Sequence, residues 1–111
     1  MPVKKTTIPK PEKQREAVIF VLKTIFDPEI PFNIYDLGLI YEIAIDPKQN
    51  IAIMMTLTTP MCPVAESMPG EVQTKLKKEL KWAKKVTVNL VWDPPWDMSK
   101  MAPDARLFLG F

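Results

Sequence analysis

The residue with the clearest capacity for chemistry is Cys62, the only cysteine in a chain of 111 residues. It stands in the segment TTPMCP and is followed by Pro63. A residue before proline is held out of the α region, and proline readily begins a helical turn, so Cys62 is expected at a cap position between a strand and a helix. Backbone N–H groups and the helix dipole at such a position favour a thiolate, which lowers the pKa of the thiol. A thiolate is the form that binds soft metals and carries out sulfur chemistry.

Two interpretations of Cys62 stay open on the residues alone. A lone cysteine is often a small buried hydrophobic residue with no reactive role. Against this, Thr59 and Pro60 begin a proline-rich connection that continues through Pro63, and connections run over protein surfaces. The prolines would hold Thr59 and Cys62 in extended geometry, which would keep the thiol accessible.

The chain contains no histidine, which excludes Cys–His and Ser–His–Asp nucleophile systems and histidine-ligated metal sites. No other catalytic constellation is apparent, so we expect a protein that is not an enzyme. A single thiol cannot form an internal disulfide, and no apolar segment suited to an export signal is present. These two features favour a reducing, cytoplasmic location.

Polar residues of a second segment, DPEIPFNIYDLG, are candidates for a supporting loop beside the thiol. They are Asp27, Glu29, Asn33, Asp36 and Gly38. Acidic and amide side chains at such positions usually cap turns, which is the simplest interpretation here. Asn33 is expected to begin a short turn, and Gly38 is expected to end it in the left-handed conformation that only glycine adopts cheaply.

Hydrophobic periodicity predicts the elements that must position these residues. Apolar residues at three- and four-residue spacing predict two helices, and strict alternation predicts three strands. In chain order these elements cover residues 12–26, 39–46, 51–58, 68–82 and 86–92. Pro28 is expected to end the first helix, and residues 46–50 should form a hairpin turn. The last residues are expected to form either a short helix or an edge segment.

Each predicted strand has one strongly apolar face and one weaker face. The strongly apolar face includes Tyr41 in the first strand and Ile51, Ile53 and Met55 in the second. This pattern is typical of a small sheet covered by helices on one side, so we expect an α/β (α+β) two-layer sandwich ordered α-β-β-α-β. The second and third strands, joined through a helix, should be parallel with a right-handed crossover, which makes the three-stranded sheet mixed. Residues 1–11 are expected to be a flexible tail, and residues 12–111 a single domain.

Composition limits the partners. Apolar residues make up 47% of the chain, charged residues 25%, and the formal net charge is +2. This charge is too small to indicate nucleic acid, and the GXXG clamp of one RNA-binding class is missing. The longest apolar run, Ala17–Leu22, is far shorter than the ~20 residues that span a bilayer, so no membrane contact is expected. Six lysines between positions 75 and 85 form either a solvated face or a contact for an acidic client.

Two tryptophans bracket the segment DPP near the end of the third predicted strand. Trp92 is expected to be buried at the end of the sheet. Trp96 would be carried on a stiff proline arm, where it would either cover Cys62 or meet a partner.

Three segments, DPEIPFNIYDLGLIYEI (27–43), MTLTTPMCPVAESMPGEV (55–72) and VNLVWDPPWDMSKMAPDARLFLGF (88–111), resemble the SufT/PaaD-like family of iron–sulfur, or metal–sulfur, cluster assembly domains. The resemblance runs from about Glu12 to the C-terminus. It implies the same two-layer fold and an accessory role in maturing iron–sulfur proteins. It also implies that Cys62 is the reactive residue of the family, that Asp27 and Glu29 of DPE form its acidic loop, and that residues 36–38 form its DLGL turn.

The resemblance further implies iron–sulfur scaffold or carrier proteins and client apoproteins as partners, and a homodimer is left open. Iron–sulfur clusters usually take four thiolate ligands, so one Cys62 per chain cannot enclose a cluster. We therefore expect transient handling of a cluster or of sulfur, with no tightly bound cofactor. Two alternatives remain: a non-catalytic subunit of a multicomponent aromatic-acid (phenylacetate) oxidation pathway, and a one-cysteine thiol redox protein, which would need an external resolving thiol.

Overall fold

A computed structural model describes residues 9–27, 30–58 and 67–110. A three-stranded sheet runs in the order β1-β2-β3, with β1 at Ile40–Ile45, β2 at Asn50–Met55 and β3 at Lys85–Leu90. The β1 and β2 strands are antiparallel, whereas β2 and β3 are parallel, as predicted for strands joined through a helix. The mixed sheet of the expected sandwich is therefore confirmed.

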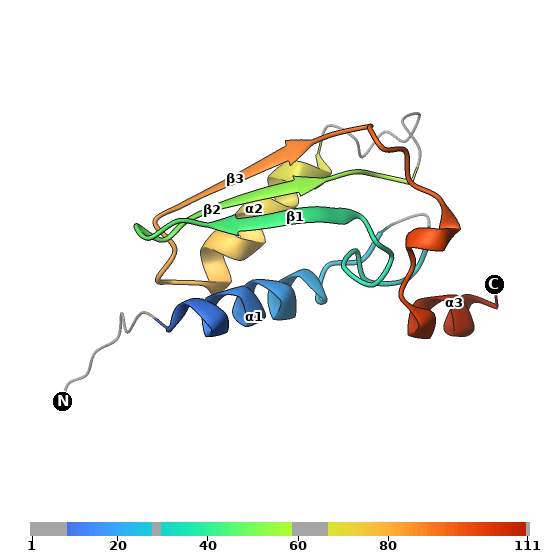
Figure 1. Cartoon of the computed structure of the whole chain (residues 1–111), viewed down its shortest axis with the longest axis horizontal. Helices are drawn as coiled ribbons and strands as arrows, with labels where there is room; N and C mark the ends of the chain where they lie inside the picture. The colour runs from blue at the N-terminus through green and yellow to red at the C-terminus, as the bar shows by residue number, and fades with distance from the viewer. Residues whose placement is uncertain (1–8, 28–29, 59–66, 111) are drawn as a thin grey trace.

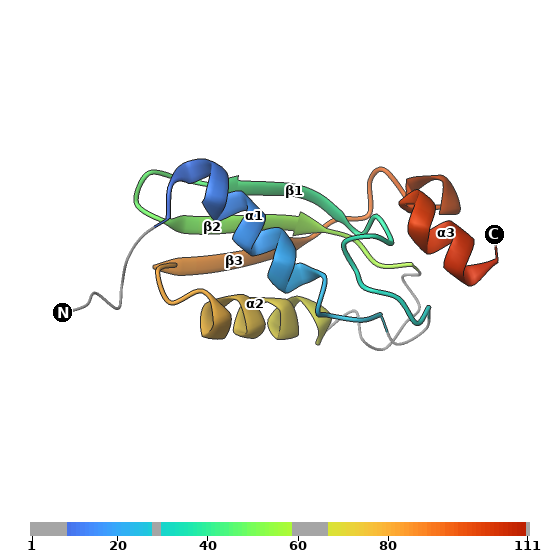
Figure 2. The ribbon, with the colours of Figure 1, turned by 90° about the horizontal axis from the view of Figure 1, so that it is seen from below.

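Two helices cover one face of this sheet. Figure 1 shows α1 (Pro11–Leu22) below the sheet and α2 (Met68–Glu79) behind the strands, and Figure 2 shows α1 crossing the strands while α2 runs beside β3. A 3-10 turn, η2 (Met98–Lys100), and a final helix, α3 (Pro103–Leu109), lie beyond the end of the sheet. The C-terminal residues thus form the helix, not the edge segment, of the two expected alternatives.

The alternation of β2 explains why only one face is covered. Ile51, Ile53 and Met55 are all buried against the helices. Between them, Met54 is exposed and Ala52 is half-buried on the opposite face. The helices contribute the matching apolar stripes, which include Val18, Val21 and Leu22 from α1 and Val72 and Leu76 from α2.

The first helix is shorter than predicted, because a local tertiary pairing replaces its last turn. We expected it to reach Phe26, but it ends at Leu22. The Ile34 N–H donates to the carbonyl of Ile25 at 2.8 Å, and an isolated antiparallel bridge joins Phe26 to Asn33. The helix therefore ends six residues before Pro28, which was predicted to stop it. Similarly, α2 ends at Glu79 instead of continuing to Trp82.

A bulge in β1 breaks the alternation expected there. Ile40 pairs with Met55 and Glu42 pairs with Met54, which leaves Tyr41 as the extra residue. Ile40 therefore packs against the core where strict alternation would have placed Tyr41. The released Tyr41 hydroxyl donates to the carbonyl of Pro94 at 2.7 Å and joins the sheet to the C-terminal segment.

One side chain from each of these two helices donates a hydrogen bond to a backbone carbonyl on an outer strand of the sheet. The Arg15 guanidinium of α1 donates to the carbonyl of Ile43 on β1 at 3.1 Å. The Gln73 amide of α2 donates to the carbonyl of Val86 on β3 at 2.7 Å. Both helices are thus fixed to the sheet by a polar contact as well as by their apolar stripes. Within the described residues, none of the helices is long and apolar enough to cross a membrane.

Candidate functional site

The segment from Asn33 to Gly38 forms a tight turn closed by its own side chains. The Asn33 Oδ1 accepts from the Asp36 N–H at 2.8 Å, and its Nδ2 donates to the Asp36 Oδ2 at 2.9 Å. The Leu37 N–H donates to the carbonyl of Asn33 at 3.1 Å. Asn33 therefore begins the turn as the sequence predicted, and both polar residues act as caps.

Gly38 ends this turn with a φ of +82°, which confirms the expected left-handed conformation. The position also requires glycine for a second reason. A Cβ added at Gly38 would overlap the backbone carbonyl of Lys100, which packs directly against the turn. The turn is therefore a contact surface for a segment more than sixty positions later in the chain.

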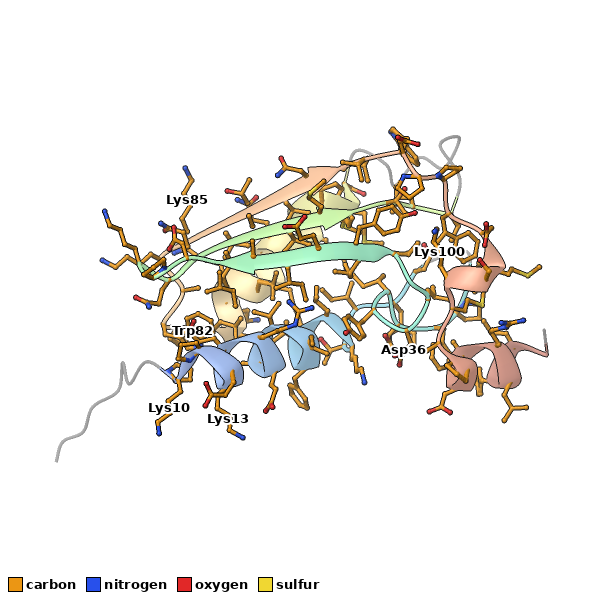
Figure 3. The ribbon with its side chains drawn as sticks, in the orientation of Figure 1. Lys10, Lys13, Asp36, Trp82, Lys85 and Lys100 are labelled. Carbon is orange, nitrogen blue, oxygen red and sulfur yellow. The ribbon has the colours of Figure 1, made fainter. Side chains whose placement is uncertain are left out.

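Two hydrogen bonds hold the C-terminal segment on this turn, and a third joins it to β1. The Trp96 indole N–H donates to the carbonyl of Leu37 at 2.7 Å, and the Ala102 N–H donates to the carbonyl of Asp36 at 2.7 Å. Tyr41 bonds to the carbonyl of Pro94 as described above. Figure 3 shows Asp36 and Lys100 at this junction between the turn and η2. The DLG segment thus positions the tryptophan arm.

The acidic residues of the first loop serve its internal structure. The Asp27 Oδ2 accepts from the Ile30 N–H at 2.8 Å, and Asp27 is only 3% exposed. The Asp36 carboxylate lies 4.0 Å from the Lys23 ammonium. These contacts agree with the turn-capping interpretation. Glu29 lies outside the described residues, so its predicted place beside the others stays a prediction.

The two tryptophans line a small apolar pocket at the end of β2. Trp92, Pro95 and Trp96 meet Leu57 and Thr58 around a space of about 170 Å³. Trp92 is 41% exposed, so its predicted burial is wrong. The reason is that β3 ends at Leu90, and Trp92 therefore follows the strand instead of packing under it. Trp96 is half-buried against the core, where its indole N–H is bonded.

The predicted reactive residue, Cys62, and its neighbours Thr59, Pro60 and Pro63 lie outside the described residues. Core residues lie close to both ends of this segment. Leu57 and Met68 are each 2% exposed and belong to the buried core. The segment carrying the thiol is thus connected at both ends to buried parts of the same sheet and helix layer, and Thr58 beside it lines the tryptophan pocket.

Two groups near the tryptophan arm have shifted pKa values. Burial, followed by the nearby carboxylates of Asp97 and Asp93, raises the pKa of the Tyr41 hydroxyl. Hydrogen bonds from the side chain and N–H of Ser99 lower the pKa of Asp97. Tyr41 therefore remains a neutral hydrogen-bond donor to Pro94 at physiological pH, and Asp97 remains charged.

The sequence indicated a basic surface but missed how its lysines meet. Lysines from α2 and from the start of β3 gather around one hollow of about 470 Å³, together with Gln73, Thr74 and Val86. Their run in the sequence was visible, but the convergence depends on packing. No group of three or more acidic or cysteine side chains suited to a metal ion occurs in the part of the chain that the structure describes.

The chain is similar to known proteins over most of its length. Residues 15–90 match the family described as iron–sulfur cluster assembly protein. A Porphyromonas gingivalis protein named Fe-S protein maturation auxiliary factor is 40% identical over 86% of this chain and 90% of its own length. A Bacillus subtilis protein of the same name, YitW, is 36% identical over 89% of this chain and 96% of its own. The crystal structure of a domain of unknown function, DUF59, from Bacillus anthracis is 32% identical with a TM-score of 0.84, covering 90% of this chain and 94% of that one.

Proposed function

Because the chain belongs to the iron–sulfur cluster assembly protein family, we propose that it is an accessory factor in the maturation of client iron–sulfur proteins. The observation that carries this proposal is the similarity, over most of both chains, to two bacterial maturation auxiliary factors. The proposed role is non-catalytic and cytoplasmic, where thiols stay reduced. Its partners would be scaffold or carrier proteins that deliver clusters and apoproteins that receive them.

We assign the reactive role to the Cys62 thiol, with the cluster or its sulfur as cargo. Cys62 is four residues after Thr58, so their Cα atoms lie within about 14 Å of each other whatever path the chain takes. Thr58 itself lines the pocket of Trp92 and Trp96 at the end of the sheet. Our proposal is that a partner contacting the tryptophan arm also meets the thiol.

A single thiol suits transfer better than storage. A cluster usually needs four thiolates, and Cys62 supplies one per chain, so the other ligands would come from the partner, a second copy or a small thiol. Carboxylates such as Asp27 and Asp36 are harder ligands and are occupied in turn capping. Incomplete coordination would leave a cluster easy to pass on.

The first test is anaerobic reconstitution with iron and sulfide on the wild type, Cys62→Ala and a matched control, Ser67→Ala. Ser67 lies at the other end of the same segment, and its side chain makes no capping hydrogen bond. We expect iron, sulfide and cluster absorption in the wild type and in Ser67→Ala, with a clear loss in Cys62→Ala. Equal uptake by all three proteins would overturn the role of the thiol.

The second test measures maturation in cells. A deletion strain is complemented with each variant, and the activity and iron content of its iron–sulfur enzymes are measured under iron limitation. We expect both values to fall in the deletion strain and with Cys62→Ala, and to be restored by the wild type and by Ser67→Ala. Normal client activity in the deletion strain itself would overturn the maturation role as a whole.

A further inference from the structure

Every charged side chain that lines the hollow between the end of α2 and the start of β3 is a lysine. Four lysines line it, with no carboxylate among its seven described lining residues. The lysines are Lys77, Lys78, Lys84 and Lys85. None of these ammonium groups has an ion-pair partner among the described residues. Four like charges that converge from two elements repel one another, so a ligand that carries negative charge would relieve this repulsion.

The backbone around the hollow is fixed by two bridges between helix and strand. The Lys77 ammonium donates to the carbonyl of Lys84 at 2.8 Å, and the Gln73 amide donates to the carbonyl of Val86 at 2.7 Å. The apolar floor at Val86 belongs to the buried core. The hollow is therefore present before any ligand arrives, which lowers the entropic cost of binding.

The chemistry of the lining favours dispersed carboxylates over a compact phosphate. All four cations are lysines, which lack the planar fork with which arginine binds phosphate. Lys77 and Lys78 lie in the last turn of α2, where the helix dipole is negative and offers no free N–H groups to an anion. The lining also has no aromatic side chain on which a nucleic-acid base could stack.

We propose that this lysine hollow is the docking site for an acidic segment of a partner protein in iron–sulfur maturation. This inference rests on the proposed function for the identity of the partner, but its physical basis is independent of Cys62. The carboxylates of an extended segment would spread over the four lysines, and the segment's backbone would lie along Gln73, Thr74 and the Val86 floor. Such contacts would hold a client or carrier in place and steer its approach.

The test uses the full chain under reducing conditions and compares two charge reversals of equal size. Lys78→Glu/Lys84→Glu reverses two charges in the hollow and keeps Lys77, which bridges the helix and the strand. The control, Lys10→Glu/Lys13→Glu, reverses two charges at the start of α1. Figure 3 shows Lys10 and Lys13 projecting below α1, on the other side of the molecule from Lys85.

The probe is a short acetylated peptide in which glutamate alternates with serine, and binding is followed by NMR of the labelled protein. We expect shifts confined to residues 73–86 and about tenfold weaker binding by the hollow variant at low salt, with the control close to wild type. Shifts spread over all lysines, or equal losses in both variants, would overturn the proposal. Stronger binding of inorganic phosphate or of single-stranded RNA at the same residues would also overturn the acidic-segment assignment.

Two further measurements distinguish a failure of this inference from a failure of the proposed function. Cys62→Ala should bind the peptide as the wild type does, because the hollow does not involve the thiol. In cells, the hollow variant should lower the iron content of client enzymes while its reconstitution with iron and sulfide stays normal. Normal client maturation with this variant would overturn the docking role even if the thiol assignment holds.

Discussion

Replacing Gly38 by alanine tests how the C-terminal segment is held on the turn. The backbone φ of +82° costs an L-residue about 1–2 kcal/mol. In addition, the new Cβ would overlap the Lys100 carbonyl, so the segment must move away. Its displacement would break the hydrogen bonds from Trp96 to Leu37 and from Ala102 to Asp36, which are worth about 0.5–1.5 kcal/mol each.

These contributions sum to a loss of about 3 kcal/mol in the free energy of unfolding, or a fall in Tm of roughly 10–20 °C for a domain of this size. Urea unfolding followed by circular dichroism measures the total. Tryptophan fluorescence of the native state reports separately on the loss of the Trp96 contact. The native emission of Gly38→Ala should move toward that of a solvent-exposed indole.

The two other glycines of the chain provide matched controls. Gly110 has the same φ of +82° but nothing within 4 Å of an added Cβ, so Gly110→Ala should cost only the conformational part, about 1–2 kcal/mol. Gly70 lies in α2 with open space and ordinary φ, so Gly70→Ala should stabilise by up to about 1 kcal/mol. Equal losses for Gly38→Ala and Gly110→Ala would refute the close packing of Lys100 against the turn.

Two further predictions concern single contacts. Trp96→Phe keeps the ring but removes the donor to Leu37, so it should lower the free energy of unfolding by about 1 kcal/mol, whereas the exposed Trp92→Phe should change it little. Equal effects of both in urea unfolding would contradict this. The N–H of Asn50, and to a lesser extent its side chain, donate hydrogen bonds that lower the pKa of Asp46 below 3.8. The charged form of Asp46 therefore stabilises the folded state above pH 3.8. This stabilisation is lost as the pH falls through the lowered pKa. Asp46→Asn should therefore destabilise the fold at about pH 6, and its difference from the wild type in urea titrations should shrink as the pH falls below 3.8. A difference independent of pH would refute the assignment.

The sequence predicted the features that depend on local periodicity and turn chemistry. The alternation of Ile51, Ile53 and Met55 predicted the buried face of β2, and the structure confirms it. Asn33 and Gly38 were predicted as the two ends of one turn because few residue types suit those positions. A backbone conformation that only a few residue types can adopt is therefore predictable from the residue found there.

The features that the sequence did not predict depend on contacts between distant segments. The early end of α1 follows from the pairing of Phe26 with Asn33, which competes with the helix. The bulge at Tyr41 is matched by a hydrogen bond to Pro94, more than fifty positions later. No local pattern could report these pairings, because each residue is ordinary in its own neighbourhood.

The candidate site also combines features that local sequence predicts with features that depend on tertiary packing. The capping roles of Asp27 and Asp36 followed from residue type and position. The exposure of Trp92 and the convergence of the lysines depend on where β3 ends and how α2 packs beside it. The role of Cys62 stays a prediction from its setting and from the family, and the reconstitution experiment tests it.

The two polar contacts from the helices to the outer strands limit how copies of this protein can associate. A free strand edge can add a strand from another molecule, and such addition leads to domain-swapped or fibrillar polymers. Here Arg15 occupies the outward carbonyl of Ile43, and Gln73 occupies that of Val86, so an incoming strand would have to displace a side chain on either rim. In the proposed role beside apoproteins, the protein would thereby resist being recruited into aggregates through its own sheet.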